Sequence, residues 1–182
     1  EMEVVFIRAP IIRRSGDSVR VWARYNEDPV LVSDGKALIE INPDRFARPG
    51  IKLFKNSWTE ETKKLENISA VIPNETGFQL TDPNGIWIYL VENTSDIDFK
   101  AEEKCYGITG NYNGLSLETS DMVKSMEFYN ILGFSQNGGS IDQGWISINN
   151  SGFPSSIMKA LACPHLFFNP SLTYFNGKNN LE

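Results

Sequence analysis

The sequence predicts a fold of the α+β class, with many short strands and two helices. Short runs rich in β-branched and aromatic residues, such as VVFIRAPII and GIKLFK, are typical of strands, and Asp-Gly and Asp-Pro-Asn-Gly steps supply turns. Two other segments have the end signals of helices. A partial internal repeat further divides the chain of 182 residues into two halves.

The first half is predicted to consist of strands with one helix. The helix covers residues 57–67, because Ser57 and Glu60 have the spacing of a capping box, in which each side chain satisfies a backbone N–H. Acidic residues at its start and lysines near its end suit the helix dipole. The strand-like runs around it are residues 4–12, 18–25, 29–42, 50–55 and 77–92.

The second half opens with GLSLET, residues 114–119, in which leucines alternate with other residues as in a strand. A helix is predicted to follow, because Ser120 or Asp121 can cap its start and Gly133 suits the left-handed conformation that ends a helix. The residues expected near one face of this helix are Met122, Met126 and Tyr129.

The internal repeat is found by aligning prolines. Residues 42–55 align with residues 163–176 without a gap, and Pro43 matches Pro164 at an offset of 121 residues. Each segment is interpreted as a bend followed by a strand, since proline restricts the residue before it. Residues 93–112 are polar, show no clear period and are expected to link the two halves.

Two segments resemble one known family. LETSDMVKSMEFYNILGF (117–134) is similar to the start, and LTDPNGIWIYLVE (80–92) to the end, of a βαβββ module of the vicinal oxygen chelate superfamily, which includes glyoxalase I, extradiol dioxygenases and bleomycin-resistance proteins. The resemblance covers roughly residues 35–92 and 113–176. It implies two such modules, with curved mixed sheets around a cavity and helices on the outer face. An unrelated α+β domain is the alternative.

On this interpretation residues 1–92 form the first module, 93–112 the linker and 113–182 the second module. Both modules are expected to be incomplete, because the first has no evident opening strand and helix and the second has no evident closing strands. The missing strands would come from residues outside this sequence or from a partner chain.

The resemblance also implies where a metal would bind. The metal enzymes of this family take carboxylate, imidazole or amide ligands from the first and last strands of each module. At the two readable positions this chain has Tyr89 and Gly114, and neither is a normal ligand for a divalent ion. The other two positions are expected to lie outside the readable sequence. We therefore expect no metal and no other cofactor, unless missing strands supply ligands.

Other catalytic arrangements find little support. His165 is the single histidine, which excludes a multi-histidine site, and its neighbour Cys163 permits a thiol–imidazole pair. A turn histidine held locally is the favoured interpretation. Cys105 and Cys163 are interpreted as free thiols of a reducing compartment, with one disulfide as the alternative. No G-x-S-x-G motif or phosphate-binding loop is present.

Strand alternation predicts a ligand-binding surface. Trp87 and Tyr89 share one face of their strand, and Ser116 and Glu118 share one face of the strand at 114–119. An aromatic wall, a hydroxyl and a carboxylate suit a small ligand with an apolar, even cationic, body. The alternative is that the aromatic side chains fill the cavity and Glu118 is solvated.

Charge and hydropathy limit the partners. The net charge is −6 and the longest basic cluster is Arg13-Arg14, so no nucleic-acid partner is expected. No apolar run reaches the length of a membrane span, and the first ten residues do not resemble a signal peptide, so a cytoplasmic location without a membrane partner is predicted.

The leading functional hypothesis is a metal-free, bleomycin-resistance-like protein that binds a small molecule and forms a homodimer. A second hypothesis is a metal-dependent lyase, isomerase or dioxygenase, completed by unseen strands or by a partner chain. A third is a non-catalytic interaction domain that dimerises through an unpaired strand edge.

Overall fold

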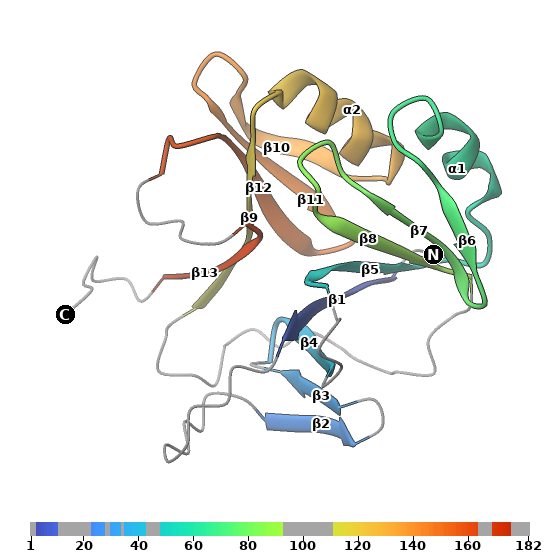
Figure 1. The fold of residues 1–182 in the computed structure, drawn as a ribbon. Coiled ribbons are helices and arrows are strands. Elements are labelled where there is room, and N and C mark those ends of the chain that lie inside the picture. The colour runs from blue at the N-terminus through green and yellow to red at the C-terminus, as the bar shows by residue number, and fades with distance from the viewer. Residues whose placement is uncertain are drawn as a thin grey trace.

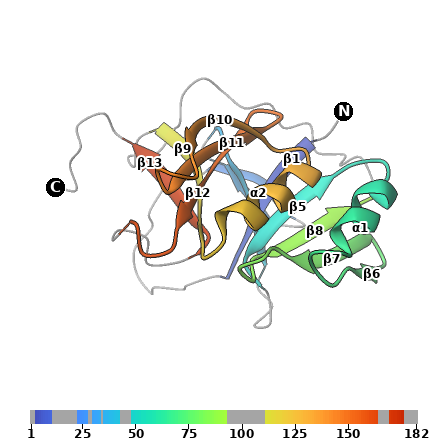
Figure 2. The same cartoon turned by 90° about the horizontal axis from the view of Figure 1, so that it is seen from above.

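The computed structural model contains two sheets and two helices (Figure 1). It describes residues 3–10, 23–27, 30–33, 35–42, 48–92, 111–163 and 169–175. Both helices lie on the same side of the molecule, above the strands in the view of Figure 1, and they lie next to each other when seen from above (Figure 2).

The larger sheet has eight strands in the order β2-β3-β4-β1-β5-β8-β7-β6. Helix α1 (Thr59–Leu65) follows β5 along the chain. The strands of this sheet are β1 (Glu3–Pro10), β2 (Ala23–Glu27), β3 (Val30–Ser33), β4 (Leu38–Asn42), β5 (Gly50–Phe54), β6 (Ile72–Asn74), β7 (Gly77–Thr81) and β8 (Trp87–Val91).

The smaller sheet has five strands in the order β10-β11-β12-β9-β13. Helix α2 (Met122–Ile131) follows β9 along the chain. The strands of this sheet are β9 (Asn111–Thr119), β10 (Ser135–Ser140), β11 (Trp145–Asn150), β12 (Phe153–Lys159) and β13 (Ser171–Phe175).

The two sheets contain the same βαβββ unit. In the first unit, β5 and α1 are followed by β6, β7 and β8, and β5 pairs in parallel with β8. In the second, β9 and α2 are followed by β10, β11 and β12, and β9 pairs in parallel with β12. The remaining pairs within each unit are antiparallel. The predicted α+β class with two curved sheets and two modules is confirmed.

This order differs from the expectation that both modules are incomplete. The opening strand and helix of the first module are β5 and α1, and the closing strands of the second are β10, β11 and β12. Residues 50–54 were expected to be a strand. Because they were aligned with residues 171–175, they were not recognised as the opening strand of the first module. The division of the chain at 92 and 113 stays a prediction, and residues 93–110 lie outside the described residues.

The repeat at an offset of 121 residues is not the repeat of the fold. It pairs β5 with β13, whereas β13 is an added strand that pairs antiparallel with β9. Its structural counterpart is β1, which pairs antiparallel with β5. Half of the matched proline and phenylalanine positions, at 43, 46, 164 and 167, lie outside the described residues.

A glycine in each opening strand identifies β5 and β9 as equivalent strands of the two modules. A Cβ atom on Gly50 would lie 2.2 Å from the carbonyl oxygen of Trp87, and one on Gly114 would lie 2.7 Å from that of Pro154. Gly114 also has φ of +136°, a region that side chains disfavour. In both modules the closing strand therefore approaches the opening strand so closely that a side chain is excluded.

One hydrophobic core extends through both modules. It includes Leu53 and Ile88 from the first sheet and Phe128, Ile146 and Ile157 from the second module. The predicted helix face is confirmed, because Met122, Met126 and Tyr129 of α2 are buried.

A buried polar network also joins the modules. Asp82, in the turn between β7 and β8, accepts a hydrogen bond of 3.1 Å from the hydroxyl of Tyr129 on α2. Asn84 of the same turn donates to Ser125, which in turn contacts Thr119. Asp82 and Tyr129 are 3% and 1% exposed. Burial raises the pKa of the Asp82 carboxyl, and burial, followed by the nearby Asp82 charge, raises the pKa of Tyr129 well above its usual range.

Candidate functional site

The predicted alternation along β8 is confirmed. Ile88 and Leu90 are fully buried in the core, whereas Trp87, Tyr89 and Val91 are half-buried on the other face of the sheet. The rings of Trp87 and Tyr89 lie nearly parallel, with centroids 6.4 Å apart and an interplanar angle of 22°. The two side chains thus form one aromatic surface on the strand face that turns away from the core.

A cavity lies beside this aromatic surface. Its volume is about 320 Å³, and Tyr89 forms part of its wall. The Tyr89 hydroxyl donates a hydrogen bond of 3.3 Å to the carbonyl oxygen of Arg48. Ring, ammonium, amide and hydroxyl groups thus surround one space. The lining residues are Lys52, Phe54, Asn74, Thr76, Phe78, Gln79, Tyr89 and Val91.

Lys52 supplies the positive charge at the cavity wall. It lies on β5 directly opposite Tyr89 in the parallel β5–β8 ladder, and its ammonium forms an ion pair with Glu40 of β4. The side chain of Glu40 is 6% exposed and that of Lys52 is 21% exposed. The ion pair with this buried carboxylate holds the Lys52 ammonium in place.

Ser116 and Glu118 lie on the second sheet. The Ser116 hydroxyl is buried and lies 2.5 Å from that of Thr173 and 3.3 Å from that of Ser156. The Glu118 carboxylate accepts a hydrogen bond from the backbone N–H of Leu161. The structure therefore places the four residues predicted to bind ligand in two pairs, one on each sheet.

The resemblance implies that metal ligands come from the opening and closing strands of each module. On the faces turned away from the core, the directly opposed residues of the opening and closing strands include Lys52 with Tyr89, Ser116 with Ser156 and Glu118 with Met158. An ammonium group has no lone pair, and neutral hydroxyls are weak ligands for a divalent ion. Glu118 is the one carboxylate among these residues, and a single carboxylate does not make a metal site of the implied kind.

Within the part of the chain that the structure describes, no group of three or more His, Cys, Asp and Glu side chains is placed to hold a metal ion. Cys163 is not part of a disulfide bond. His165 and Cys105 lie outside the described residues. The favoured interpretation of His165 as a turn histidine, and the alternative of a thiol–imidazole pair, are therefore untested.

Sequence reasoning missed part of the cavity wall. Lys52 and Phe54 share the outer face of β5, a placement that follows from strand alternation in IKLF and could have been found. Asn74 and Gln79 had no comparable signal, because their approach to Tyr89 depends on the pairing of β7 with both β6 and β8.

The solved structures most informative about the fold are dioxygenases. The 2,3-dioxygenase LapB from Pseudomonas sp. KL28 matches 93% of this chain and 72% of its own with a TM-score of 0.50 and 13% identity. A catechol 2,3-dioxygenase matches 85% of this chain and 65% of its own with a TM-score of 0.52 and 12% identity. A variant of homoprotocatechuate 2,3-dioxygenase from Brevibacterium fuscum reaches a TM-score of 0.53 at 9% identity, over 86% of this chain and 52% of its own.

These neighbours are extradiol dioxygenases, and they place the chain in the vicinal oxygen chelate fold. At such identities the likeness shows the fold alone. No protein-family model matches the chain.

Sequence comparison with curated proteins finds a different, short match. The chain is 59% identical over 39 residues to the pyridoxal 5'-phosphate synthase subunit PdxT of Solibacter usitatus, covering 21% of this chain and 20% of that protein. PdxT of Kosmotoga olearia is 62% identical over 34 residues, or 19% of this chain and 18% of that protein. The chain thus spans about a fifth of the length of the curated relatives it matches.

Neither of the helices that the structure describes is long and apolar enough to cross a membrane. The cytoplasmic location stays a prediction.

Proposed function

We propose that this protein binds a small organic molecule in the cavity beside Tyr89, without a metal ion. The observation that carries this proposal is the cavity itself. Its volume of about 320 Å³ lies within the range of ligand pockets, and it opens on the strand face turned away from the core. Tyr89 is thus both a residue predicted from the sequence to bind ligand and part of the cavity wall.

The wall indicates the chemistry of the ligand. Tyr89 and Phe54 offer aromatic surface, against which a flat apolar group can pack. Gln79 and Asn74 carry amides that both donate and accept hydrogen bonds, and Lys52 donates from a charged group. A ligand with one flat apolar part and several polar substituents therefore suits the cavity best. Trp87, and Ser116 and Glu118 on the other sheet, do not line this cavity and stay predicted ligand contacts.

The fold of the neighbours favours one alternative function. Metal-dependent dioxygenases have this fold, so a lyase, isomerase or dioxygenase is the second candidate. Because the opposed residues of the opening and closing strands do not match a metal site, this function requires ligands from outside the described residues or from a partner chain. Metal content distinguishes the two candidates.

Replacing Tyr89 with alanine should weaken binding in the cavity by about tenfold or more, because about 1.4 kcal/mol of lost contact corresponds to a tenfold change in affinity. The measurement is ligand-observed NMR with a fragment library, first on the wild-type protein and then on the variant. Tyr89→Phe is the matched control, since it keeps the ring and loses only the hydroxyl.

Hits that bind wild type and Tyr89→Phe but not Tyr89→Ala would support the proposal. Hits that bind all three proteins equally would place the site elsewhere and contradict it. A library without any hit would remove the support for a small-molecule binding function.

A further inference from the structure

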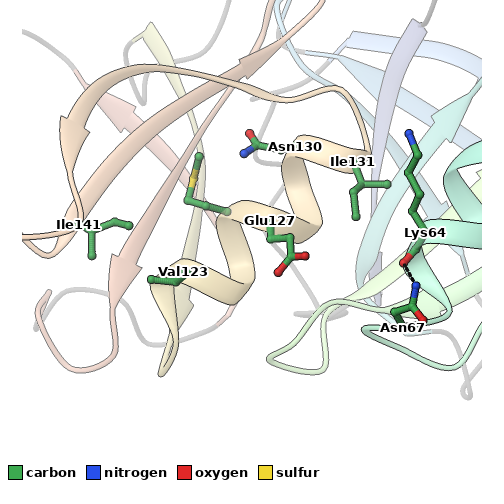
Figure 3. A pocket seen from close by; sticks show the side chains of 8 residues that line it. Lys64, Asn67, Val123, Glu127, Asn130, Ile131 and Ile141 are labelled. Carbon is green, nitrogen blue, oxygen red and sulfur yellow. Dashed lines mark hydrogen bonds between the residues drawn. The ribbon is translucent and has the colours of Figure 1, made fainter.

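A groove runs along the outer side of α2, between the end of α1 and the turn that joins β10 to β11 (Figure 3). Its volume is about 790 Å³. Ile141 lies at one end and Lys64 with Asn67 at the other, and side chains of α2 lie between them. The lining residues are Lys64, Asn67, Val123, Met126, Glu127, Asn130, Ile131 and Ile141.

Several apolar side chains that line this groove are exposed to solvent. Val123 is 62% exposed and Ile141 is 44% exposed, and Ile131 is half-buried between them and α1. Helix α2 thus carries apolar residues on its outer side as well as on the side that contacts the core. Single exposed apolar residues are common, but a group of them that lines one groove is typical of a protein interface.

We propose that a second copy of this chain covers the groove with its own α2, giving a two-fold symmetric dimer. In such an interface the same surface is used by both copies, so each contact occurs twice. An antiparallel pair of α2 helices meets this condition. Glu127 of one copy then faces Asn130 of the other, whose amide can donate to the carboxylate.

The two ends of the groove are complementary in charge. Lys64 is exposed at one end, and Asp142, which is also exposed, follows Ile141 at the other. A two-fold rotation places the basic end of each copy on the acidic end of its partner. The aliphatic stem of Lys64 can then cover Ile141 while its ammonium reaches Asp142. Such rim pairs contribute little affinity, but they select the register of the two copies.

The first test is the molar mass in solution, measured by size-exclusion chromatography with light scattering on the full chain from low to high micromolar concentration. The proposal expects a dimer for the wild type and a monomer for Val123→Glu. Leu161→Glu is the matched control, because Leu161 is 92% exposed and does not line the groove, and it should stay dimeric.

A monomeric wild type would overturn the proposal, whether the groove is open or is covered by the chain's own residues. A dimer that survives Val123→Glu would also overturn it, because the interface would lie elsewhere.

A charge exchange tests the register. Lys64→Glu and Asp142→Lys should each weaken the dimer several-fold, because each places like charges at both ends of the interface. The double variant should restore the wild-type dissociation constant, measured by sedimentation equilibrium. A double variant that dissociates at least as readily as the two single variants would contradict the antiparallel pairing. Both positions are exposed, so neither substitution removes a core contact.

Discussion

Replacing Trp58 with alanine is expected to lower the free energy of unfolding by about 3–5 kcal/mol, the usual cost of removing a buried aromatic side chain. Trp58 has no exposed surface and belongs to the core that both modules share. Its indole N–H donates a hydrogen bond of 3.1 Å to the carbonyl oxygen of Val91, and its backbone N–H donates one of 2.7 Å to the Glu92 carboxylate. The alanine variant loses the packing and the indole hydrogen bond together.

Urea unfolding followed by circular dichroism measures this change. Trp58→Phe is the control, because it keeps an aromatic ring in the core and loses the hydrogen bond to Val91, so its loss should be smaller. An alanine variant that loses less than about 1 kcal/mol would show that the site relaxes around the gap and that Trp58 does not hold α1 on β8.

Replacing Asp82 with alanine is expected to cost about 3 kcal/mol, because several buried donors lose their acceptor at once. The Asp82 carboxylate accepts hydrogen bonds from the backbone N–H groups of Asn84 at 2.8 Å and Ile86 at 2.9 Å, and from the Tyr129 hydroxyl at 3.1 Å. The measurement is again urea unfolding.

Asp121→Ala is the matched control for this prediction. Asp121 is exposed and its side chain accepts one backbone hydrogen bond, from Lys124 at the start of α2. Loss of such a cap costs about 1 kcal/mol. Equal losses for the Asp82 and Asp121 variants would contradict the role of Asp82 as a buried link between the modules.

The same network gives a stability that depends on pH in a defined direction. Burial raises the pKa of Asp82, so the folded protein keeps this proton over a range of pH in which the unfolded chain has lost it. The contribution of Asp82 to stability is therefore full below its unfolded pKa and is lost as pH rises through the folded pKa. Tyr129, whose pKa is also raised, gives a second loss at alkaline pH. Asp82→Asn should remove the first loss, and Tyr129→Phe the second.

The second helix was predicted correctly because the contacts at its two ends join residues that are close in the sequence. Asp121 caps α2 through Lys124, three residues away, and Gly133 after its end has φ of +87°. The start of α1 was predicted incorrectly. The capping box of Ser57 and Glu60 does not form, and the carboxylate that caps Trp58 comes from Glu92, 34 residues along the chain. Such a contact exists only once β8 has been placed beside β5.

The candidate site shows the same division between local and distant information. Alternation within β8 was sufficient to place Trp87 and Tyr89 on the face away from the core, because the period of a strand is local. The hydrogen-bond partners of Ser116 could not be predicted from alternation within one strand, because Thr173 and Ser156 lie on two other strands. The ion pair of Lys52 with Glu40 likewise depends on β1 lying between β5 and β4.

The alignment of the two modules failed for a related reason. Proline and phenylalanine were matched between residues 42–55 and 163–176, but both residue types are common wherever a bend precedes a strand. Two positions that the fold does constrain in both modules are Gly50 and Gly114, where the closing strand leaves no space for a side chain. Their role became visible only from the approach of Trp87 and Pro154.

Metal content tests most directly whether this vicinal oxygen chelate fold works here without a divalent ion. The measurement is elemental analysis of the full chain purified without chelator, with protein mass determined on the same sample. Because the opposed strand positions carry Lys52, Tyr89, Ser116 and Ser156, with Glu118 as the one carboxylate beside them, the expected result is no divalent metal above trace level. Iron, manganese, nickel or zinc at close to one ion per chain would contradict it and would make the metal-dependent enzyme the leading candidate.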